Sequence, residues 1–128
     1  MKLLLDTHLL LWAAGAPERL SAEARAWMAA PQHELLFSTV SLWEVAIKSS
    51  LGRDDFAVDV GVLRRGLLEN GYLELAVAGE HAVAVANLPP LHRDPFDRML
   101  AAQAQVEGIT LLTCDPLLAA YPGPIKRV

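Results

Sequence analysis

The stretch Lys2-Leu3-Leu4-Leu5-Asp6 decides the fold class, because three consecutive leucines stand directly before an acid. A short apolar run of this kind predicts a strand that is buried on both faces, as strands of a parallel sheet are. Leu35–Phe37 and Ile109–Leu112 predict buried strands in the same way. Because helical segments separate these runs, we expect an α/β fold in which helices cover both faces of a mostly parallel sheet.

The helix signals are clearest after the proline-containing segment 88–93. Asp94 is a good N-cap, Pro95 suits the first helical position, and Gly108 marks the end of the same helix. The other elements that the sequence predicts are helices over Thr7–Ala14, Ala22–Ala30, Ser41–Leu51, Val60–Asn70 and Glu80–Asn87, a short helix from Pro116, and strands over Tyr72–Val77 and Ile125–Val128. We therefore expect one domain over residues 1–128.

Composition excludes several classes of protein. Hydrophobic residues make up 53% of the 128 residues, which is enough for a continuous core. Cys114 is the one cysteine, so an intrachain disulfide and a multi-cysteine zinc site are both excluded. The early apolar run Leu9–Ala14 is far shorter than the ~20 residues of a membrane-spanning helix, so we expect a cytoplasmic protein. Because the formal net charge is -4, charge alone does not indicate nucleic-acid binding.

Acidic residues follow the predicted strands, where ligands bind in open α/β sheets. Asp6 ends the first strand, Glu44 lies shortly after the second, and Asp115 follows Leu112. Asp94 and Asp97 open the helix before that last strand. Several carboxylates at one edge of a sheet repel one another, and a hard cation such as Mg²⁺ removes the conflict. The pattern favours a metal site that acts on a phosphodiester.

Each acid also has a purely structural interpretation. Ser41 and Glu44 have the spacing of a capping box, in which Ser41 would be the cap of its helix. Asp94 and Asp115 each stand before a proline and can cap a helix. Asp6 differs, because a carboxylate at the end of an apolar strand needs a specific partner.

Four segments in this order are similar to the motifs of the PIN domain, and most of all to VapC-type toxins of prokaryotic toxin–antitoxin pairs. They are Leu5-Asp6-Thr7-His8, Ser41-Leu42-Trp43-Glu44 with Lys48 one turn on, Asp94-Pro95-Phe96-Asp97-Arg98, and Leu112-Thr113-Cys114-Asp115. The resemblance covers nearly the whole chain, and it implies a three-layer α/β/α sandwich with a mostly parallel central sheet.

The resemblance also implies a function. PIN domains of this kind cleave RNA with Mg²⁺ or Mn²⁺, are held inactive by an antitoxin, and commonly form homodimers. The motifs place the catalytic and metal-binding acids at Asp6, Glu44, Asp97 and Asp115. The expected additional or supporting residues are Asp94, Thr7, Ser41 and Thr113.

The sequence also suggests locations and contacts for several side chains outside the acidic set. Lys48 and Arg98 are candidates for contacts with RNA phosphates, and Arg98 is also a candidate for pairing with the acids. We expect Trp12 and Trp43 to pack in the core. Expected surface residues are His33, His81 and His92, which lack metal-ligand spacing. Leu9–Ala14 is apolar nearly all round, so we expect this helix to be buried or to meet another chain.

Other functions remain open at this point. A phosphatase of the haloacid dehalogenase type also has an acid after its first strand, but it needs a second one where His8 stands. A receiver-type switch needs an acid at the end of its third strand, and Tyr72–Val77 ends without one. A PIN-fold nuclease without a toxin role, or a PIN fold used only for binding, is a further alternative. The sequence does not identify the RNA.

Overall fold

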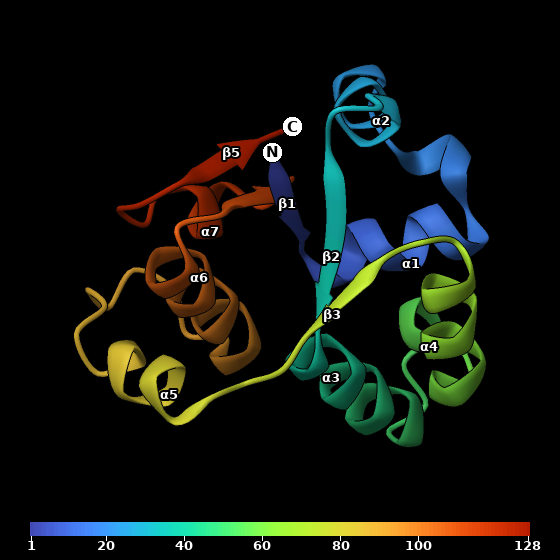
Figure 1. Cartoon of the computed structure of the whole chain (residues 1–128). Coiled ribbons are helices and arrows are strands. Elements are labelled where there is room, and N and C mark those ends of the chain that lie inside the picture. Colours follow the sequence, from blue (N-terminus) through green and yellow to red (C-terminus); the bar gives the residue numbers. More distant parts are fainter.

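A sheet of five parallel strands runs through the computed structural model, which describes residues 1–128. The strands are β1 (Lys2–Leu5), β2 (Glu34–Ser38), β3 (Leu73–Leu75), β4 (Thr110–Thr113) and β5 (Ile125–Arg127), in the spatial order β3-β2-β1-β4-β5. At the centre, Leu4 of β1 is in register with Leu36 of β2 and with Leu111 of β4. The chain builds outward from β1 to β3 and then returns to add β4 and β5 on the other side (Figure 1). The strand order therefore switches direction between β1 and β4.

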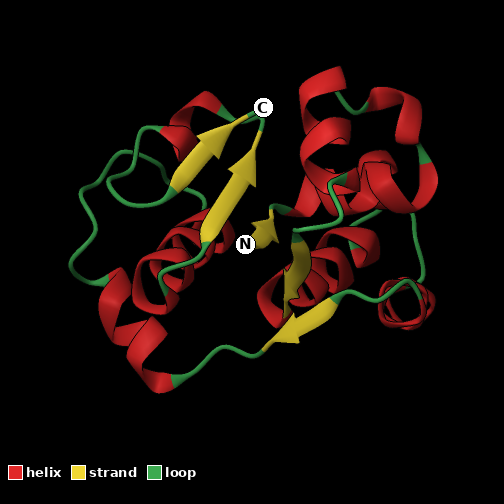
Figure 2. Ribbon diagram, turned by 45° about the horizontal axis from the view of Figure 1, so that its top comes forward, coloured by secondary structure: helices red, strands yellow, loops and turns green.

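Helices cover both faces of this sheet, as Figure 2 shows. The first group is α1 (Thr7–Gly15), α2 (Ala22–Ala29), α3 (Thr39–Ser50) and α4 (Val60–Glu69), and the second is α5 (Gly79–Val85), α6 (Pro95–Glu107) and α7 (Pro116–Ala119). Two short 3-10 turns, Pro17–Arg19 and Asp54–Phe56, were not expected from the sequence. The predicted α/β/α sandwich is confirmed, and all strand pairs in it are parallel.

Two hydrophobic cores lie on the two faces, and β1 supplies both. Leu3 and Leu5 pack with α1, α2, α3 and α4, while Leu4 packs with α6 and α7. All three leucines are fully buried. Side chains of a strand alternate between faces, so three consecutive apolar residues are explained by a sheet that is covered on both sides.

The predicted N-cap was confirmed for α6, whereas for α3 the helix was predicted correctly and its cap was wrong. Asp94 caps α6 with Oδ1 2.8 Å from the amide nitrogen of Phe96, and Gly108 ends it at a φ of 66°. By contrast, α3 begins directly after β2 and Ser38 is its cap, with the Val40 amide donating to Ser38 Oγ at 3.0 Å. Ser41 lies inside the helix and is buried, so the predicted capping box with Glu44 does not exist.

None of these helices is both long enough and apolar enough to cross a bilayer. In α1, Leu9 and Leu10 are buried as expected, and Leu11, Trp12 and Ala13 are half-buried.

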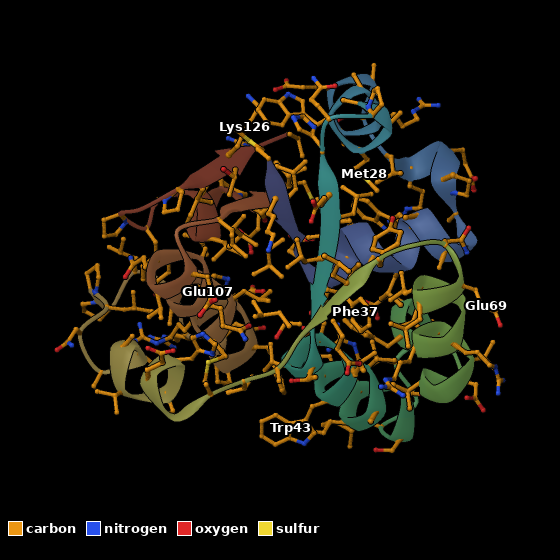
Figure 3. All side chains as sticks on the ribbon, viewed as in Figure 1. Met28, Phe37, Trp43, Glu69, Glu107 and Lys126 are labelled. Carbon is orange, nitrogen blue, oxygen red and sulfur yellow. The ribbon has the colours of Figure 1, made fainter.

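Trp43 of α3 was expected in the core, and this expectation was wrong. Its side chain is 62% exposed and points away from α3 in Figure 3.

Candidate active site

Asp6 lies at the junction of β1 and α1, where the sheet places it below the surface. Its carboxylate is a helix cap, because the Leu9 amide donates to Oδ1 at 2.9 Å. The other oxygen, Oδ2, accepts from the Thr113 hydroxyl of β4 at 2.6 Å. Asp6 is only 4% exposed, and burial raises the pKa of its carboxyl above the ordinary value in spite of these two donors. The local hydrogen bonds therefore do not fully offset the cost of burying this charge.

Glu44 approaches the same region from α3 and is 2% exposed. Its Oε1 lies 2.6 Å from the hydroxyl oxygen of Thr7, which in turn lies 2.9 Å from the Ser41 hydroxyl. Its Oε2 lies 2.5 Å from Nζ of Lys48, one helical turn further on. Thr7, Ser41 and Lys48 thus fix the carboxylate of Glu44 in one orientation.

Asp97 and Asp115 form the more accessible side of the cluster, with side chains 17% and 35% exposed. Nε2 of His92 lies between them, 3.1 Å from Oδ2 of Asp97 and 3.0 Å from Oδ2 of Asp115. Burial opposes ionisation of Asp115, but the Leu117 amide and His92 outweigh it and hold its pKa below the ordinary value.

Asp94 combines two roles at the start of α6. Its Oδ1 accepts from the amides of Phe96 and Asp97, at 2.8 and 3.1 Å. Its Oδ2 lies 3.7 Å from Nζ of Lys48. Asp94 is therefore mainly a helix cap whose second oxygen faces the cluster.

The electrostatics of Asp97 show that the acids share one site. Burial is the largest cause that raises its pKa to about 8, and the remaining causes are the negative charges of Asp94, Asp6, Glu44 and Asp115. All four other candidate acids thus act on one carboxyl group. Near neutral pH Asp97 keeps its proton most of the time, because burial disfavours the ionised form and the neighbouring negative charges add to this effect.

These residues fit a hard divalent cation. The donors are carboxylate oxygens, which Mg²⁺ and Mn²⁺ prefer, and a cation would relieve the repulsion that, after burial, contributes to the raised pKa of Asp97. The residues that could hold the cation are Asp6, Glu44, Asp97 and Asp115. His92, Asp97 and Asp115 bring potential ligand atoms within 4.8 Å of one another.

The motifs and the geometry agree with the comparison to known families. Residues 3–124 match the family model of the PIN domain. The chain belongs to the PIN domain family. A relative within reach of direct sequence comparison is Ribonuclease VapC22 of Mycobacterium tuberculosis, which is 31% identical over 123 residues. The aligned region covers 94% of this chain and 92% of that relative.

Solved structures with the same fold include VapBC complexes. VapBC2 from Rickettsia felis, bound to a DNA fragment from its promoter, superposes with a TM-score of 0.72 at 15% identity and covers 99% of this chain and 98% of that chain. DNA-bound VapBC from Salmonella typhimurium superposes with a TM-score of 0.66 at 17% identity, and it has the same coverage of the two chains. At these identities the likeness shows the fold, and it confirms the α/β/α sandwich.

The PIN motifs located the acids and missed a histidine. His92 was expected at the surface, yet it lies between two of the acids, and His81 is 2% exposed and faces Glu107 at 2.9 Å. The signal for His92 was its place two residues before the cap of α6. Glu80, His81 and Glu107 form a second group with ligand-like spacing, but the Glu80 and Glu107 side chains belong to the exposed surface.

The two cations expected to contact RNA are used within the PIN domain itself. Lys48 pairs with Glu44 and is 17% exposed. Arg98 pairs with no acid, so that expectation was wrong. Its guanidinium donates to the carbonyls of Pro89 and Val85 and to the hydroxyl of Tyr121.

Proposed function

We propose that this single PIN domain is a Mg²⁺- or Mn²⁺-dependent endoribonuclease and the toxin of a type II toxin–antitoxin pair. One observation carries the proposal: Asp6, Glu44, Asp97 and Asp115 converge beyond the carboxyl ends of β1 and β4, where the strand order switches. The 31% identity to a protein named as a ribonuclease supports RNA as the substrate. Membership of the PIN family removes the phosphatase and receiver alternatives.

The acids divide into a buried and an accessible pair. Asp6 and Glu44 are almost fully buried, whereas the Asp97 and Asp115 side chains reach the surface. RNA would therefore approach from the side of Asp97 and Asp115. A bound Mg²⁺ or Mn²⁺ supplies charge neutralisation at the phosphodiester and lowers the pKa of a water.

Neighbouring side chains orient the two buried acids by hydrogen bonds and an ion pair. The Thr113 hydroxyl orients Asp6, and the Thr7 hydroxyl orients Glu44. Lys48 pairs with Glu44 and supplies a positive charge beside this buried side chain. Hydrolysis adds water across one P–O bond of the RNA backbone, and it requires no covalent intermediate on any of these residues.

A cleavage assay tests the enzymatic part of the proposal. We expect the purified protein to cut mixed RNA with Mg²⁺ or Mn²⁺ and to be inactive in EDTA. Asp6→Asn should abolish cleavage, whereas Asp59→Asn should not. Asp59 is a matched control, because it is also an acidic helix cap, on α4, but lies outside the cluster. Equal cleavage in EDTA, or full activity of Asp6→Asn, would refute the metal-dependent nuclease.

The antitoxin partner is supported by the VapBC complexes that share the fold and by a groove. The groove has a volume of about 820 Å³ and lies between α1 and α4, where Trp12, Val58, Val62 and Leu67 are among its lining residues. We expect an apolar segment of the antitoxin to occupy it. Expression of the chain alone should slow growth, and co-expression of the neighbouring small open reading frame should restore it.

A pair of variants tests the groove. Val62 is 54% exposed in the groove, and Val83 is 69% exposed on α5 outside it. Val62→Asp should stay toxic during co-expression, whereas Val83→Asp should still be neutralised. Harmless expression of a chain shown to be an active ribonuclease would leave the alternative of a PIN nuclease without a toxin role.

The resemblance to VapC-type proteins further supports a homodimer. The exposed apolar side chain of Trp43 is available for self-association. Sedimentation should give a dimer for the parent and a weaker dimer for Trp43→Ser. A monomer at all concentrations would refute this part of the proposal.

A further inference from the structure

His92 belongs to the loop between α5 and α6, and the buried side chain of Tyr121 fixes its backbone. The His92 amide donates to the hydroxyl oxygen of Tyr121 at 2.9 Å, and this hydroxyl lies 3.3 Å from the His92 carbonyl oxygen. Nη1 of Arg98 donates to the same hydroxyl at 2.9 Å and to the Pro89 carbonyl at 3.1 Å. Tyr121 is 3% exposed. Arg98 and Tyr121 therefore form a clamp that holds His92 over the acids.

The contacts of the imidazole determine which nitrogen carries the proton. Nδ1 accepts from the Asp94 amide at 3.2 Å, so Nδ1 uses its lone pair and carries no hydrogen. The proton of the neutral ring then lies on Nε2. Nε2 faces the oxygens of Asp97 and Asp115 at 3.1 and 3.0 Å, and an N–H donor there is shared between the two carboxylates. In this tautomer Nε2 has no free lone pair for a cation.

We propose that His92 is a positioning residue: its Nε2–H holds Asp97 and Asp115 side by side for the cation, and His92 is not itself a ligand. This inference rests on the proposed function, because it concerns the same metal site. It separates two roles that the short distances alone would allow, since a histidine between two carboxylates is also a common arrangement of metal ligands.

Calorimetric titration with Mg²⁺ and with Mn²⁺ distinguishes the roles without measuring cleavage. Loss of a group that orients metal ligands lowers metal affinity about 10- to 100-fold. We expect His92→Ala to lose at least tenfold in affinity for both ions, by the same factor. A direct nitrogen ligand would instead favour the transition metal, so its loss would lower the affinity for Mn²⁺ far more than the affinity for Mg²⁺. That outcome would overturn the inference.

Glutamine offers a rescue that a merely structural role would not show. His92→Gln keeps an N–H donor that can reach the carboxylates, and we expect it to recover most of the affinity that His92→Ala loses. The electron paramagnetic resonance spectrum of bound Mn²⁺ should show no directly coordinated ¹⁴N in the parent. A strong ¹⁴N coupling that disappears in His92→Gln would identify His92 as a ligand and refute the inference.

His81 is a matched control, because its ring has the same pattern of contacts elsewhere. Its Nδ1 accepts from the Ala78 amide at 2.9 Å, and its Nε2 lies 2.9 Å from Glu107. His81→Gln should leave the affinity for both ions unchanged. Tyr121→Phe removes only the hydroxyl of the clamp, so it keeps the inference testable if His92→Ala fails to fold. We expect this variant to lose affinity for Mg²⁺ and for Mn²⁺ by the same factor.

The outcomes separate this inference from the proposed function. A parent that binds neither ion would refute the metal site and the inference together. A parent that binds both ions tightly, with His92→Ala and Tyr121→Phe unchanged from it, would refute the inference and leave the proposed nuclease intact.

Discussion

Nζ of Lys48 lies 2.5 Å from Oε2 of Glu44, and the Glu44 side chain is only 3% exposed. The same ammonium group lies 3.7 Å from Oδ2 of Asp94. Lys48 is thus a positive charge built into a cluster of carboxylates, at the point where α3 meets α6. Without it, Glu44 would be a buried charge with only the Thr7 hydroxyl as a close partner.

Lys48→Met should therefore destabilise the protein, because methionine keeps the stem of the side chain and removes its charge. Removing one partner of a buried ion pair costs about 3–5 kcal/mol, and we expect the lower end because Lys48 is 17% exposed. Urea unfolding in EDTA measures the effect. Lys126→Met is the control, since its partner Glu23 is 53% exposed and such surface pairs contribute about 1 kcal/mol or less. Equal losses in the two variants would contradict a special role for Lys48.

Thr113 bridges two of the acids through one hydroxyl group. It donates to Oδ2 of Asp6 at 2.6 Å and accepts from the Asp115 amide at 3.0 Å. Thr113→Val keeps the shape but leaves both groups without this partner, which should cost roughly 1–3 kcal/mol of unfolding free energy. The pKa of Asp6 should rise further, because the Thr113 hydroxyl is the largest influence that lowers it.

Thr110→Val serves as the comparison for that variant, because Thr110 lies on the same strand and its hydroxyl has only a long contact with the Met1 sulfur. It should change stability by less than about 0.5 kcal/mol. Urea unfolding compares the two threonines, and NMR titration of Asp6 follows its pKa. A Thr113→Val protein as stable as Thr110→Val would show that the bridge is not needed.

The sequence predicted the parts of the fold that depend on local signals. Leu3, Leu4 and Leu5 required a strand covered on both faces, and Asp94 with Pro95 located the start of α6. The positions of the acids followed from topology, because the carboxyl ends of parallel strands meet at one edge. These inferences needed no knowledge of the partners of any side chain.

Two of the failures involve contacts between segments that are distant in the sequence. The position of His92 two residues before the cap of α6 places it near Asp97, but its contacts with Asp115 and Tyr121, 23 and 29 residues later, have no local sequence signal. Arg98 stands next to an acid in sequence, but its guanidinium bonds to groups on the loop and α5. Ser38 rather than Ser41 caps α3, because β2 leads into the helix with no intervening loop.

The raised pKa of Asp97 predicts an inverted dependence of stability on pH. An unfolded Asp has a pKa of about 3.9, whereas in the folded protein that of Asp97 is raised to about 8. Between these values the folded state binds more protons, so the free energy of unfolding in EDTA should fall as pH rises from 5 to 8. One such group changes the free energy of unfolding by at most about 1.4 kcal/mol per pH unit.

Urea unfolding at several pH values checks this slope. Saturating Mn²⁺ should flatten or reverse it, because the cation binds the ionised carboxylates. Asp97→Asn should also flatten it in EDTA, since the group that takes up the proton is gone. Asp115 does not mask the effect, because its lowered pKa acts below pH 4. A stability that rises with pH in EDTA would contradict the raised pKa.

Asp94 and Asp97 lie one turn apart on α6, and their asparagine variants should differ in both stability and activity. Asp94 accepts two amide hydrogens with Oδ1, a role that asparagine fills about as well. Asp94→Asn should therefore cost less than about 1 kcal/mol and keep most of the cleavage. Asp97→Asn should lose metal-dependent cleavage, and near pH 8 in EDTA it should be at least as stable as the parent, because it removes one of several crowded negative charges. Melting each variant in EDTA and assaying it with Mn²⁺ gives both results. If Asp94→Asn is inactive while Asp97→Asn still cuts RNA, the assignment of the ligand within Asp94-Pro95-Phe96-Asp97 is reversed.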